Sequence, residues 1–409
     1  MKLKICIFLI VVATGPVSGY SQALALSPLE ELGKRMFFDR TLSDPPGQGC
    51  VTCHLPTAGW TGDTSEINEG PAVYPGAVHE RSGNRKPPTV AYATFSPVFH
   101  YDAEEQLFVG GNFWNGRATG WLLGDPAAEQ AQAPFLNPVE QNLQSAALVV
   151  QKVCNADYGP RFRDTYGVDI CNNTVNAYNA IGQSIAAFEA SREVSAFSSK
   201  YDYYLKDPKR FPLTAQELLG LQVYEDEKKG NCAACHPSRP GPDGSPPLFT
   251  DFTFDNLGFP KNPNNTWYQM PKEINPDGRA WIDQGLGGFL SHVPRFAKYA
   301  QENLGKHKVP TLRNVDRRPF EDFVKSYGHN GYFKNLKDVV HFYNTRDVLP
   351  ACDAIGRPKP NHNCWPAPEV AANVNQEELG NLGLTEEQEW ALVAFMKTLS
   401  DGWNAARAE

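Results

Sequence analysis

Apolar and polar residues follow the same helical pattern at two distant places in the chain. Each place begins with a capping box, in which a serine or threonine precedes a glutamate by three residues, and continues with Leu-Gly and then an aromatic residue. The pattern predicts two equivalent helices, one at the start of each of two related units. The two copies are Ser27-Pro28-Leu29-Glu30 with Leu32-Gly33 and Phe37, and Thr214-Ala215-Gln216-Glu217 with Leu219-Gly220 and Tyr224.

Three further segments carry helix or turn signals. The spacing of apolar residues from Thr174 to Leu205 predicts one long amphipathic helix and its extension, and Asp207-Pro208 to Pro212 is typical of a hinge. Thr385, with Gln388 three residues later, predicts the start of a final helix. The apolar face of that helix is expected to contain Trp390, Leu392, Val393 and Phe395.

A second repeat follows each of the two equivalent helices. Lys86-Pro87-Pro88-Thr89-Val90 is echoed by Lys308-Val309-Pro310-Thr311-Leu312. Duplication of one small unit is the simplest explanation. The 34 glycines and 33 prolines predict long loops around the helices. We therefore expect a mainly α fold with two domains, residues 26–206 and 207–409.

The N-terminal segment and the net charge indicate the cellular compartment and the class of partner. Residues 1–25 combine basic residues near Met1, an apolar run from Ile5 to Ala13 and small residues up to Ala25, which is typical of a secretory signal peptide. We expect an exported, periplasmic protein with no membrane span, because this run is too short. The net charge of −8 argues against nucleic acid or an anionic membrane as a partner.

Nine cysteines fall into three groups. Cys6 lies in the predicted signal, and four others lie in the two motifs described next. The remaining four suggest two disulfides in an oxidising compartment. Proximity favours pairing Cys154 with Cys171 and Cys352 with Cys364, although three pairings exist and free buried thiols are an alternative.

Each predicted domain contains one Cys-x-x-Cys-His pentad, the attachment signature of c-type haem. Two thiols one helical turn apart can bond the porphyrin edge, and the adjacent histidine can reach the iron. We expect two covalently bound haem c groups, with His54 and His236 as proximal ligands. The pentads are Cys50-Val51-Thr52-Cys53-His54 and Cys232-Ala233-Ala234-Cys235-His236.

Two other classes of site use Cys-x-x-Cys. A zinc ribbon places its second pair roughly 15 to 20 residues after the first, whereas Cys53 and Cys232 are far apart. A redox-active pair does not explain a following histidine in both copies. The spacing therefore favours haem attachment over either alternative.

With these motifs the chain resembles the bacterial di-haem cytochrome c peroxidase and MauG family. The resemblance covers essentially the whole length after the signal and implies two cytochrome c-like domains, each with one haem. Beyond the pentads it includes Phe113-Trp114-Asn115-Gly116-Arg117-Ala118, Leu136-Asn137-Pro138-Val139-Glu140, Val309-Pro310-Thr311-Leu312-Arg313-Asn314 and His329-Asn330-Gly331.

The resemblance implies roles around the first haem. Trp114 matches a tryptophan between the haems on the electron route, where the alternative is an ordinary core aromatic. Arg117 is expected to pair with a haem propionate. Gln130, Pro134 and Glu140 match the residues of the peroxide-binding pocket, in which Glu140 serves as general acid and base. Asn137-Pro138-Val139-Glu140 also has the pattern of a capped helix start, and both readings can hold.

Tyr343 lies fourteen residues after His329, where the family's peroxidases place a methionine ligand of the second haem and MauG-type enzymes a tyrosine. The resemblance thus implies Tyr343 as that ligand, and an anionic oxygen donor favours oxidised iron. The alternative is a helical core stripe of Leu336, Val339, Val340 and Tyr343. Competing ligands are His341, Met270 and Met396.

Two further positions differ from the family pattern. His79 lies one residue out of register with a histidine that occupies the distal site of the first haem at rest, and a solvated loop histidine is the favoured alternative. His100 is a weaker substitute. Family members bind calcium between the domains, and Lys86 stands where an asparagine ligand is expected, which puts a calcium cofactor in doubt.

The expected function is a peroxidase-type oxidoreductase that reacts with hydrogen peroxide. The chain either reduces peroxide to water with electrons from a small redox protein, a cytochrome c or a cupredoxin, or uses high-valent iron to oxidise a protein substrate as MauG does. The alternative from another class is a non-catalytic di-haem electron-transfer cytochrome. An open coordination site on one iron would distinguish the peroxidase, which needs it, from the electron carrier, which does not.

Overall fold

The computed structural model describes residues 25–405, and it is mainly helical with long connecting loops. The segment interpreted as a signal lies outside this range up to residue 24, together with Cys6. The helices are α1 (Pro28–Phe38), α2 (Cys50–Cys53), α3 (Ser65–Glu69), α4 (Pro126–Leu136), α5 (Ala146–Asn155), α6 (Gly159–Tyr166), α7 (Thr174–Ala190), α8 (Lys200–Lys206), α9 (Ala215–Glu225), α10 (Gly285–Leu290), α11 (Leu336–Thr345) and α12 (Glu386–Lys397).

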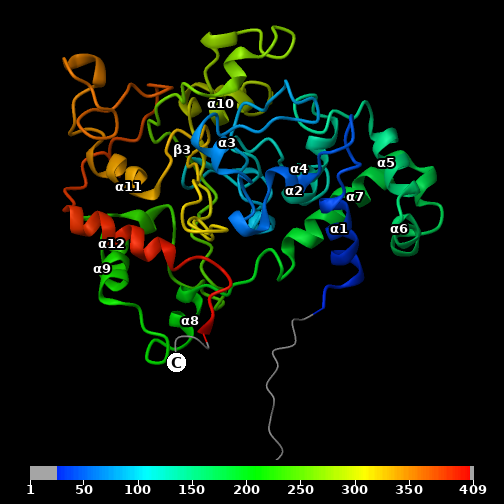
Figure 1. Cartoon of the computed structure of the whole chain (residues 1–409), viewed down its shortest axis with the longest axis horizontal. Helices are drawn as coiled ribbons and strands as arrows, with labels where there is room; N and C mark the ends of the chain where they lie inside the picture. The colour runs from blue at the N-terminus through cyan, green and yellow to red at the C-terminus, as the bar shows by residue number, and fades with distance from the viewer. Residues whose placement is uncertain (1–24, 406–409) are drawn as a thin grey trace, which may run out of the picture.

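Two separate apolar cores organise these helices. Buried residues between Leu32 and Val194 form the first core, and those between Tyr201 and Leu399 form the second. Figure 1 shows α1, α5, α6 and α7 on one side of the molecule and α9, α11 and α12 on the other. Long loops fill the region between the two groups.

The same close helix pairing builds each core. Gly33 on α1 faces α7, where a Cβ atom would lie 1.8 Å from the Ser184 carbonyl oxygen. Gly220 on α9 faces α12, where a Cβ atom would lie 2.0 Å from the Ala391 carbonyl oxygen. Only glycine permits this approach of two backbones. The equivalent glycines of the repeat therefore perform the same packing task.

The aromatic residues around these contacts are also equivalent. In the first core, Phe37, Trp60 and Phe188 form a triangle with ring centroids 5.5 to 5.9 Å apart. In the second core, Tyr224, Phe249 and Phe395 form a corresponding triangle at 5.0 to 6.4 Å. The structure thus supports the duplication predicted from the repeat.

The predicted helix starts are confirmed, because Ser27, Thr214 and Thr385 all form complete capping boxes. The predicted apolar face of the last helix is correct for Leu392, Val393 and Phe395 and wrong for Trp390, which is 47% exposed. The contact of Ala391 with α9 turns the preceding position outward.

The prediction of a long helix and its extension from Thr174 to Leu205 is correct for the start at Thr174 and wrong for the continuity of the helix. Helix α7 ends at Ala190 and α8 begins at Lys200. The Ser195 hydroxyl between them donates to the Glu189 carbonyl at 3.0 Å and accepts from the Tyr92 backbone N–H at 2.9 Å. The bond to the distant loop at Tyr92 and the bond back to Glu189 together hold the intervening segment in a non-helical path.

Helix α8 packs with the second core. Tyr201 lies 5.2 Å from the Phe395 ring, and Asp202 forms a buried ion pair with Arg313 at 2.8 Å. The expected hinge, residues 207–212, forms a mainly exposed turn between α8 and α9.

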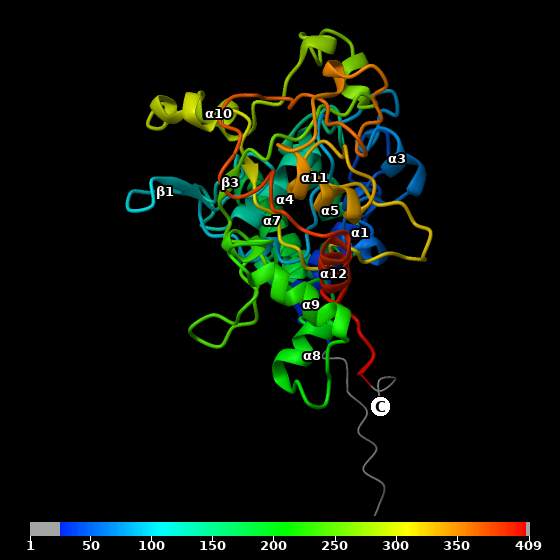
Figure 2. The same cartoon turned by 90° about the vertical axis from the view of Figure 1, so that its left-hand side faces the viewer.

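Two small antiparallel sheets complete the fold. Strands β1 (His100–Asp102) and β2 (Leu107–Val109) form a hairpin, and β3 (Phe254–Asp255) pairs with β4 (His307–Lys308). Figure 2 shows the β1 hairpin and α10 projecting from the same side of the molecule. Phe99, Phe108, Phe254, Leu286 and Leu290 form a third small core beneath them.

Two disulfides confirm the favoured pairings, Cys154 with Cys171 and Cys352 with Cys364. Each closes a short loop, of 17 and 12 residues in sequence separation. Among the described helices, none has the length and apolar character needed to cross a bilayer.

Candidate functional site

A large, mainly apolar cavity lies between the two cores and joins the two pentads. Its lining includes His54, Trp114 and Gln130 from the first half and His236 and Tyr343 from the second. Residues separated by almost three hundred positions in the sequence therefore share one cavity.

Local hydrogen bonds hold the first pentad, whose His54 lines this cavity. Cys50 and Cys53 are the first and last residues of α2, and the His54 backbone N–H donates to the Cys50 carbonyl at 3.1 Å. The His54 Nδ1 atom lies 3.1 Å from the Trp60 carbonyl oxygen. An Nδ1–H that donates to this carbonyl leaves the Nε2 lone pair free for a metal.

The second pentad has the same arrangement. The His236 backbone N–H donates to the Cys232 carbonyl at 2.9 Å, and the His236 Nδ1 atom lies 2.7 Å from the Phe249 carbonyl oxygen. Burial lowers the pKa of both His54 and His236 to about 4. Both imidazoles are therefore neutral near pH 7, which is the form that binds a metal.

The Pro-Thr repeats secure the two carbonyl groups that orient these histidines. The Thr89 hydroxyl donates to the Gly59 carbonyl at 2.8 Å, and the Val90 N–H donates to the Trp60 carbonyl at 3.3 Å. The second copy repeats both bonds, from Thr311 to Leu248 at 2.6 Å and from Leu312 to Phe249 at 3.2 Å. The repeat found in the sequence is thus part of the support of each proximal histidine.

The four pentad cysteines are unpaired thiols. Burial raises their pKa values, to about 12 for Cys53, Cys232 and Cys235. Among residues 25–405, none of them belongs to a group of three or more close potential metal ligands, which argues against structural zinc. Two neutral thiols, an oriented imidazole and an apolar cavity fit covalent attachment of haem at each pentad.

Trp114 lies at the junction of the two halves. Its side chain is 8% exposed, and its indole N–H donates to the Lys86 carbonyl at 2.7 Å. The Lys308 backbone N–H donates to the Trp114 carbonyl at 2.8 Å. Trp114 therefore contacts the equivalent lysines of both repeats.

The residues expected in the peroxide pocket come from α4 and the turn that follows it. Gln130 and Pro134 lie on α4, and Glu140 lies in the turn. Asn137 is the C-cap of α4 and α5 begins at Ala146, so the prediction of a helix start at Asn137 is wrong. Pro134 provides the reason, because its carbonyl accepts the N–H groups of Asn137 and Gln141, which closes a turn.

Glu140 is held by one bond to its carboxylate, and within residues 25–405 no donor is seen on its other oxygen. The Asn137 side-chain amide donates to Glu140 Oε2 at 2.6 Å. Burial raises the pKa of Glu140, and the Arg117 charge and the Asn137 bond oppose that shift. A carboxyl group with a raised pKa exchanges protons more readily near neutral pH.

Arg117 lies beside this pocket but is itself exposed. Its guanidinium carbon lies 3.6 Å from the centre of the Phe113 ring, and Nη1 donates to Asn115 Oδ1 at 3.1 Å. His79 is exposed on a nearby loop, as the solvated alternative predicts, and His100 is exposed in β1. Neither histidine lines the cavity.

Tyr343 lines the cavity together with the rest of its helical stripe, Leu336, Val339 and Val340. Burial raises its pKa well above the ordinary value, and the thiols of Cys235 and Cys232 add to that effect. Tyr343 therefore lies close to the second pentad. Of the competing ligands, only Met396 also lines the cavity. His341 bonds instead to Glu389 at 3.0 Å, and Met270 Sδ accepts the Ser82 N–H.

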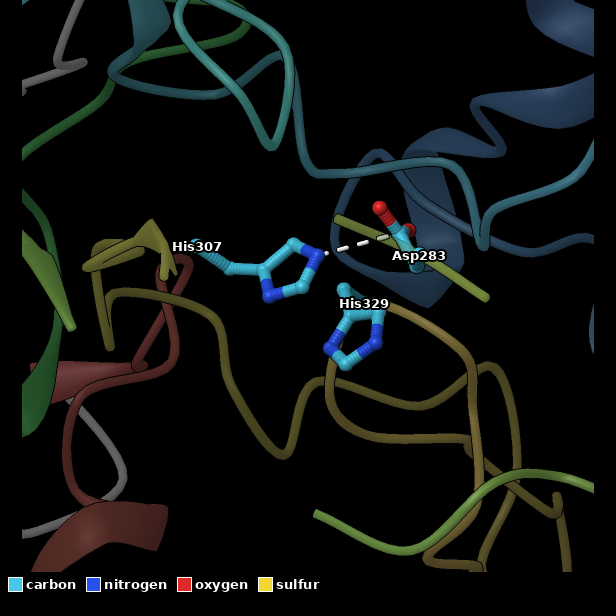
Figure 3. A group of neighbouring side chains, drawn as sticks. All are labelled: Asp283, His307 and His329. Atoms are coloured by element: carbon cyan, nitrogen blue, oxygen red, sulfur yellow. Dashed lines mark ion pairs between the residues drawn. The ribbon is translucent and has the colours of Figure 1, made fainter. Parts of the chain in front are cut away.

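A buried polar cluster on the cavity wall was not predicted from the sequence. Figure 3 shows Asp283, His307 and His329, whose imidazole rings stack with centroids 3.6 Å apart. Arg85 forms two bonds of 2.6 Å to Asp283, and Glu369 lies 3.4 Å from His329 Nε2. His329 belongs to the His329-Asn330-Gly331 motif and His307 precedes the Lys308 repeat, but the partner carboxylates Asp283 and Glu369 carry no local signal.

Comparisons with known proteins agree with this geometry. A family model described as di-haem cytochrome c peroxidase matches residues 27–210. The chain is 34% identical over 379 residues to the methylamine utilization protein MauG of Paracoccus denitrificans (strain Pd 1222), which covers 91% of this chain and 88% of that protein. It is 27% identical over 379 residues to a cytochrome-c peroxidase of Denitromonas iodatirespirans, which covers 90% and 80% respectively.

A solved structure has the same overall arrangement. The diheme peroxidase BthA from Burkholderia thailandensis E264 matches with a TM-score of 0.72 and 31% identity, over 92% of this chain and 87% of that one. The family implies two c-type haems. On this evidence the chain belongs to the di-haem cytochrome c peroxidase and MauG family of peroxidase-type oxidoreductases.

Proposed function

We propose that the chain forms two cytochrome c-like domains with one covalent haem each, residues 26–206 and 207–409, except that α8 (Lys200–Lys206) packs with the second domain. Cys50 and Cys53 attach the first haem and His54 is its proximal ligand. Cys232, Cys235 and His236 do the same for the second. The matching bonds of His54 and His236 to the Trp60 and Phe249 carbonyls support this assignment.

The first domain binds hydrogen peroxide beside Glu140. When bound, the haems would supply the coordination site for peroxide and two electrons, which together with two protons from solvent break the O–O bond and give two waters. Glu140 takes a proton from the near peroxide oxygen and delivers it to the far one. Since Asn137 binds Oε2, the Oε1 atom is the one that carries the proton. Gln130 and Pro134 on α4 are assigned to the same pocket; of these two and Glu140, only Gln130 lines the shared cavity.

In the second domain Tyr343 would hold the haem iron as its second ligand, and this haem would supply a place to store or relay an oxidising equivalent. The observation that carries this proposal is the shared cavity, whose wall contains His54, Trp114, His236 and Tyr343. Trp114 lies on the route between the domains, and its N–H stays bound to the Lys86 carbonyl. Arg117 pairs with a haem propionate at the edge of the first site. His79 is a weaker candidate for a resting distal ligand, since it is exposed.

Two reactions share the peroxide step. The chain either reduces peroxide with electrons from a small periplasmic redox protein, such as a cytochrome c or cupredoxin, or oxidises residues of a protein substrate. Tyr343 and the 34% identity to a MauG protein favour the second reaction. Steady turnover with a reduced cytochrome c or cupredoxin would favour the first. A non-catalytic electron carrier, the alternative, would show no open iron site and no response to peroxide.

Electron paramagnetic resonance of the purified ferric protein tests the proposal, together with its intact mass. We expect the mass of two haems, one high-spin signal from the open site, and a low-spin signal that changes in Tyr343→Met. Met396→Leu is the matched control, because Met396 lines the same cavity. An unchanged low-spin signal in Tyr343→Met, or a change only in Met396→Leu, would disprove the ligand assignment.

A further inference from the structure

Two lysine side chains are buried side by side in the wall of the shared cavity. Lys86 and Lys325 are 7% and 4% exposed, and both line the cavity. The Lys86 ammonium donates to Thr61 Oγ1 at 2.8 Å and to the Pro87 carbonyl at 3.1 Å. The Lys325 ammonium donates to the carbonyls of Ala58 and Arg317 at 2.7 and 2.9 Å.

All four partner atoms are neutral oxygens. Among residues 25–405, no carboxylate forms an ion pair with either lysine. Burial lowers the pKa of Lys86 to about 7, and burial together with the nearby charge of Lys86 lowers the pKa of Lys325 well below its ordinary value. Hydrogen bonds to neutral oxygens only partly offset the cost of burying an ammonium group, and a nearby negative charge is needed to keep it protonated. Among the described residues no negative charge offsets the burial of Lys86, and Asp316, which is paired with Arg318, only partly offsets that of Lys325.

The two lysines lie where the halves of the molecule meet. The Lys86 backbone N–H donates to the His329 carbonyl at 2.8 Å, and its carbonyl accepts the Trp114 indole N–H at 2.7 Å. The Lys325 ammonium lies next to Gly59, where a Cβ atom would be 3.3 Å from its nitrogen. Gly59 directly precedes Trp60, whose carbonyl orients His54. Both charges are thus built into the junction on the side of the first pentad.

This chemistry leaves no room for a bound calcium ion. Calcium requires six to eight oxygen ligands, usually with carboxylates among them. Here the oxygens near Lys86 and Lys325 already accept hydrogen bonds from the two ammonium groups. A divalent cation beside these ammonium groups would also be repelled by their charge. A haem carboxylate, in contrast, would supply the charge that the lysines lack.

We propose that Lys86 and Lys325 form a basic pair at the domain junction, which holds its protons fully when it binds haem carboxylate and which takes the place of the family's calcium ion. The identity of the anion rests on the proposed haem content. The independence from calcium does not, because it follows from the lysines themselves.

The first experiment measures calcium in the purified haem-loaded protein after dialysis against EGTA, and the thermal midpoint with and without added calcium chloride. We expect no calcium above the background of the dialysis buffer and no shift of the midpoint. Calcium retained in a one-to-one ratio, or a midpoint raised by calcium, would overturn the proposal. Intact mass of the same sample reports the haem content separately, so failure of the proposed function is distinguishable.

The second experiment compares haem reduction potentials in Lys86→Met and Lys325→Met, with exposed Lys272→Met as the matched control. Removing a positive charge beside a haem disfavours the reduced iron, so each buried variant should lower one potential, while the control should not. Unchanged potentials in both buried variants would contradict the pairing with haem carboxylate. If either variant fails to fold, the salt dependence of the wild-type potentials replaces it. A buried charge pair is screened little by salt, so strongly salt-dependent potentials would count against the proposal.

Discussion

The indole N–H of Trp114 donates to the main-chain carbonyl oxygen of Lys86 at 2.7 Å. Lys86 lies in the loop that follows the first pentad. The Trp114 carbonyl oxygen in turn accepts the backbone N–H of Lys308 in the second half, so Trp114 links the two halves. Because the acceptor is a carbonyl and not a side chain, the bond depends on the path of the backbone and not on the identity of residue 86.

Trp114→Phe should retain the fold but slow electron transfer between the two haem sites. Loss of the indole N–H leaves the buried Lys86 carbonyl without this donor, which costs about 1–3 kcal/mol of stability. We expect slower transfer of oxidising equivalents between the haems, measured by stopped-flow absorbance after mixing with peroxide. Trp390→Phe is the control, since Trp390 is 47% exposed on α12 and should change neither quantity. Equal rates in wild type and Trp114→Phe would remove Trp114 from the electron route.

Glu140→Gln should slow the reaction with peroxide and leave haem attachment intact. The amide keeps the shape of the side chain but cannot shuttle a proton, and loss of general acid–base catalysis costs about 10²- to 10⁴-fold in rate. The rate is measured at saturating donor over a range of pH. Glu80→Gln, an exposed glutamate on the adjacent loop, is the control. A Glu140→Gln variant as fast as wild type would show that the proton transfer uses another group.

Gly220→Ala should destabilise the second core. The added Cβ would lie 2.0 Å from the Ala391 carbonyl, so α9 and α12 must separate, and overpacking of this kind costs about 1–3 kcal/mol or more. Thermal unfolding followed by circular dichroism measures the loss. Gly356→Ala is the control, because its Cβ would meet no atom within 4 Å. Gly33→Ala should match Gly220→Ala, and a neutral effect in both would contradict the close helix pairing.

Glu389 should make the second core sensitive to acid. Although burial opposes ionisation, bonds from His341, Lys337 and Asn344 lower its pKa to about 2 from the ordinary 4.5. The unfolded chain therefore binds the proton more readily, and the stability that this group contributes is lost as pH falls from about 4.5 toward 2. Denaturant unfolding across that range should show a smaller pH dependence in Glu389→Gln than in wild type. Glu387→Gln, exposed on the same helix, should keep the wild-type slope.

Removal of either disulfide should lower stability without affecting haem attachment. Each closes a short loop, and the chain-entropy model assigns about 3 kcal/mol to a loop of this size. The paired variants Cys154→Ala with Cys171→Ala, and Cys352→Ala with Cys364→Ala, are compared by denaturant unfolding. Spectra of the haems should remain those of wild type. A change in the haem spectra would mean that the loops also shape the sites.

Several features were predictable because neighbouring residues in the sequence determine them. The capping boxes at Ser27, Thr214 and Thr385 need only four consecutive residues, and all three form as predicted. The two disulfides also join near neighbours in sequence. In contrast, the break after Ala190 depends on Tyr92, almost a hundred residues earlier, so the helical pattern alone could not show it.

The sequence by itself determined the repeated units, the two pentads and the equivalent glycines at the helix crossings, because each is encoded in a short run of residues. Only the tertiary structure decided which distant groups share the cavity: Trp114 against Lys86, His307 stacked on His329, and Lys86 beside Lys325. The physical reason is that burial, charge and hydrogen bonding between such groups depend on how two cores pack against one another. No local pattern along the chain carries that information.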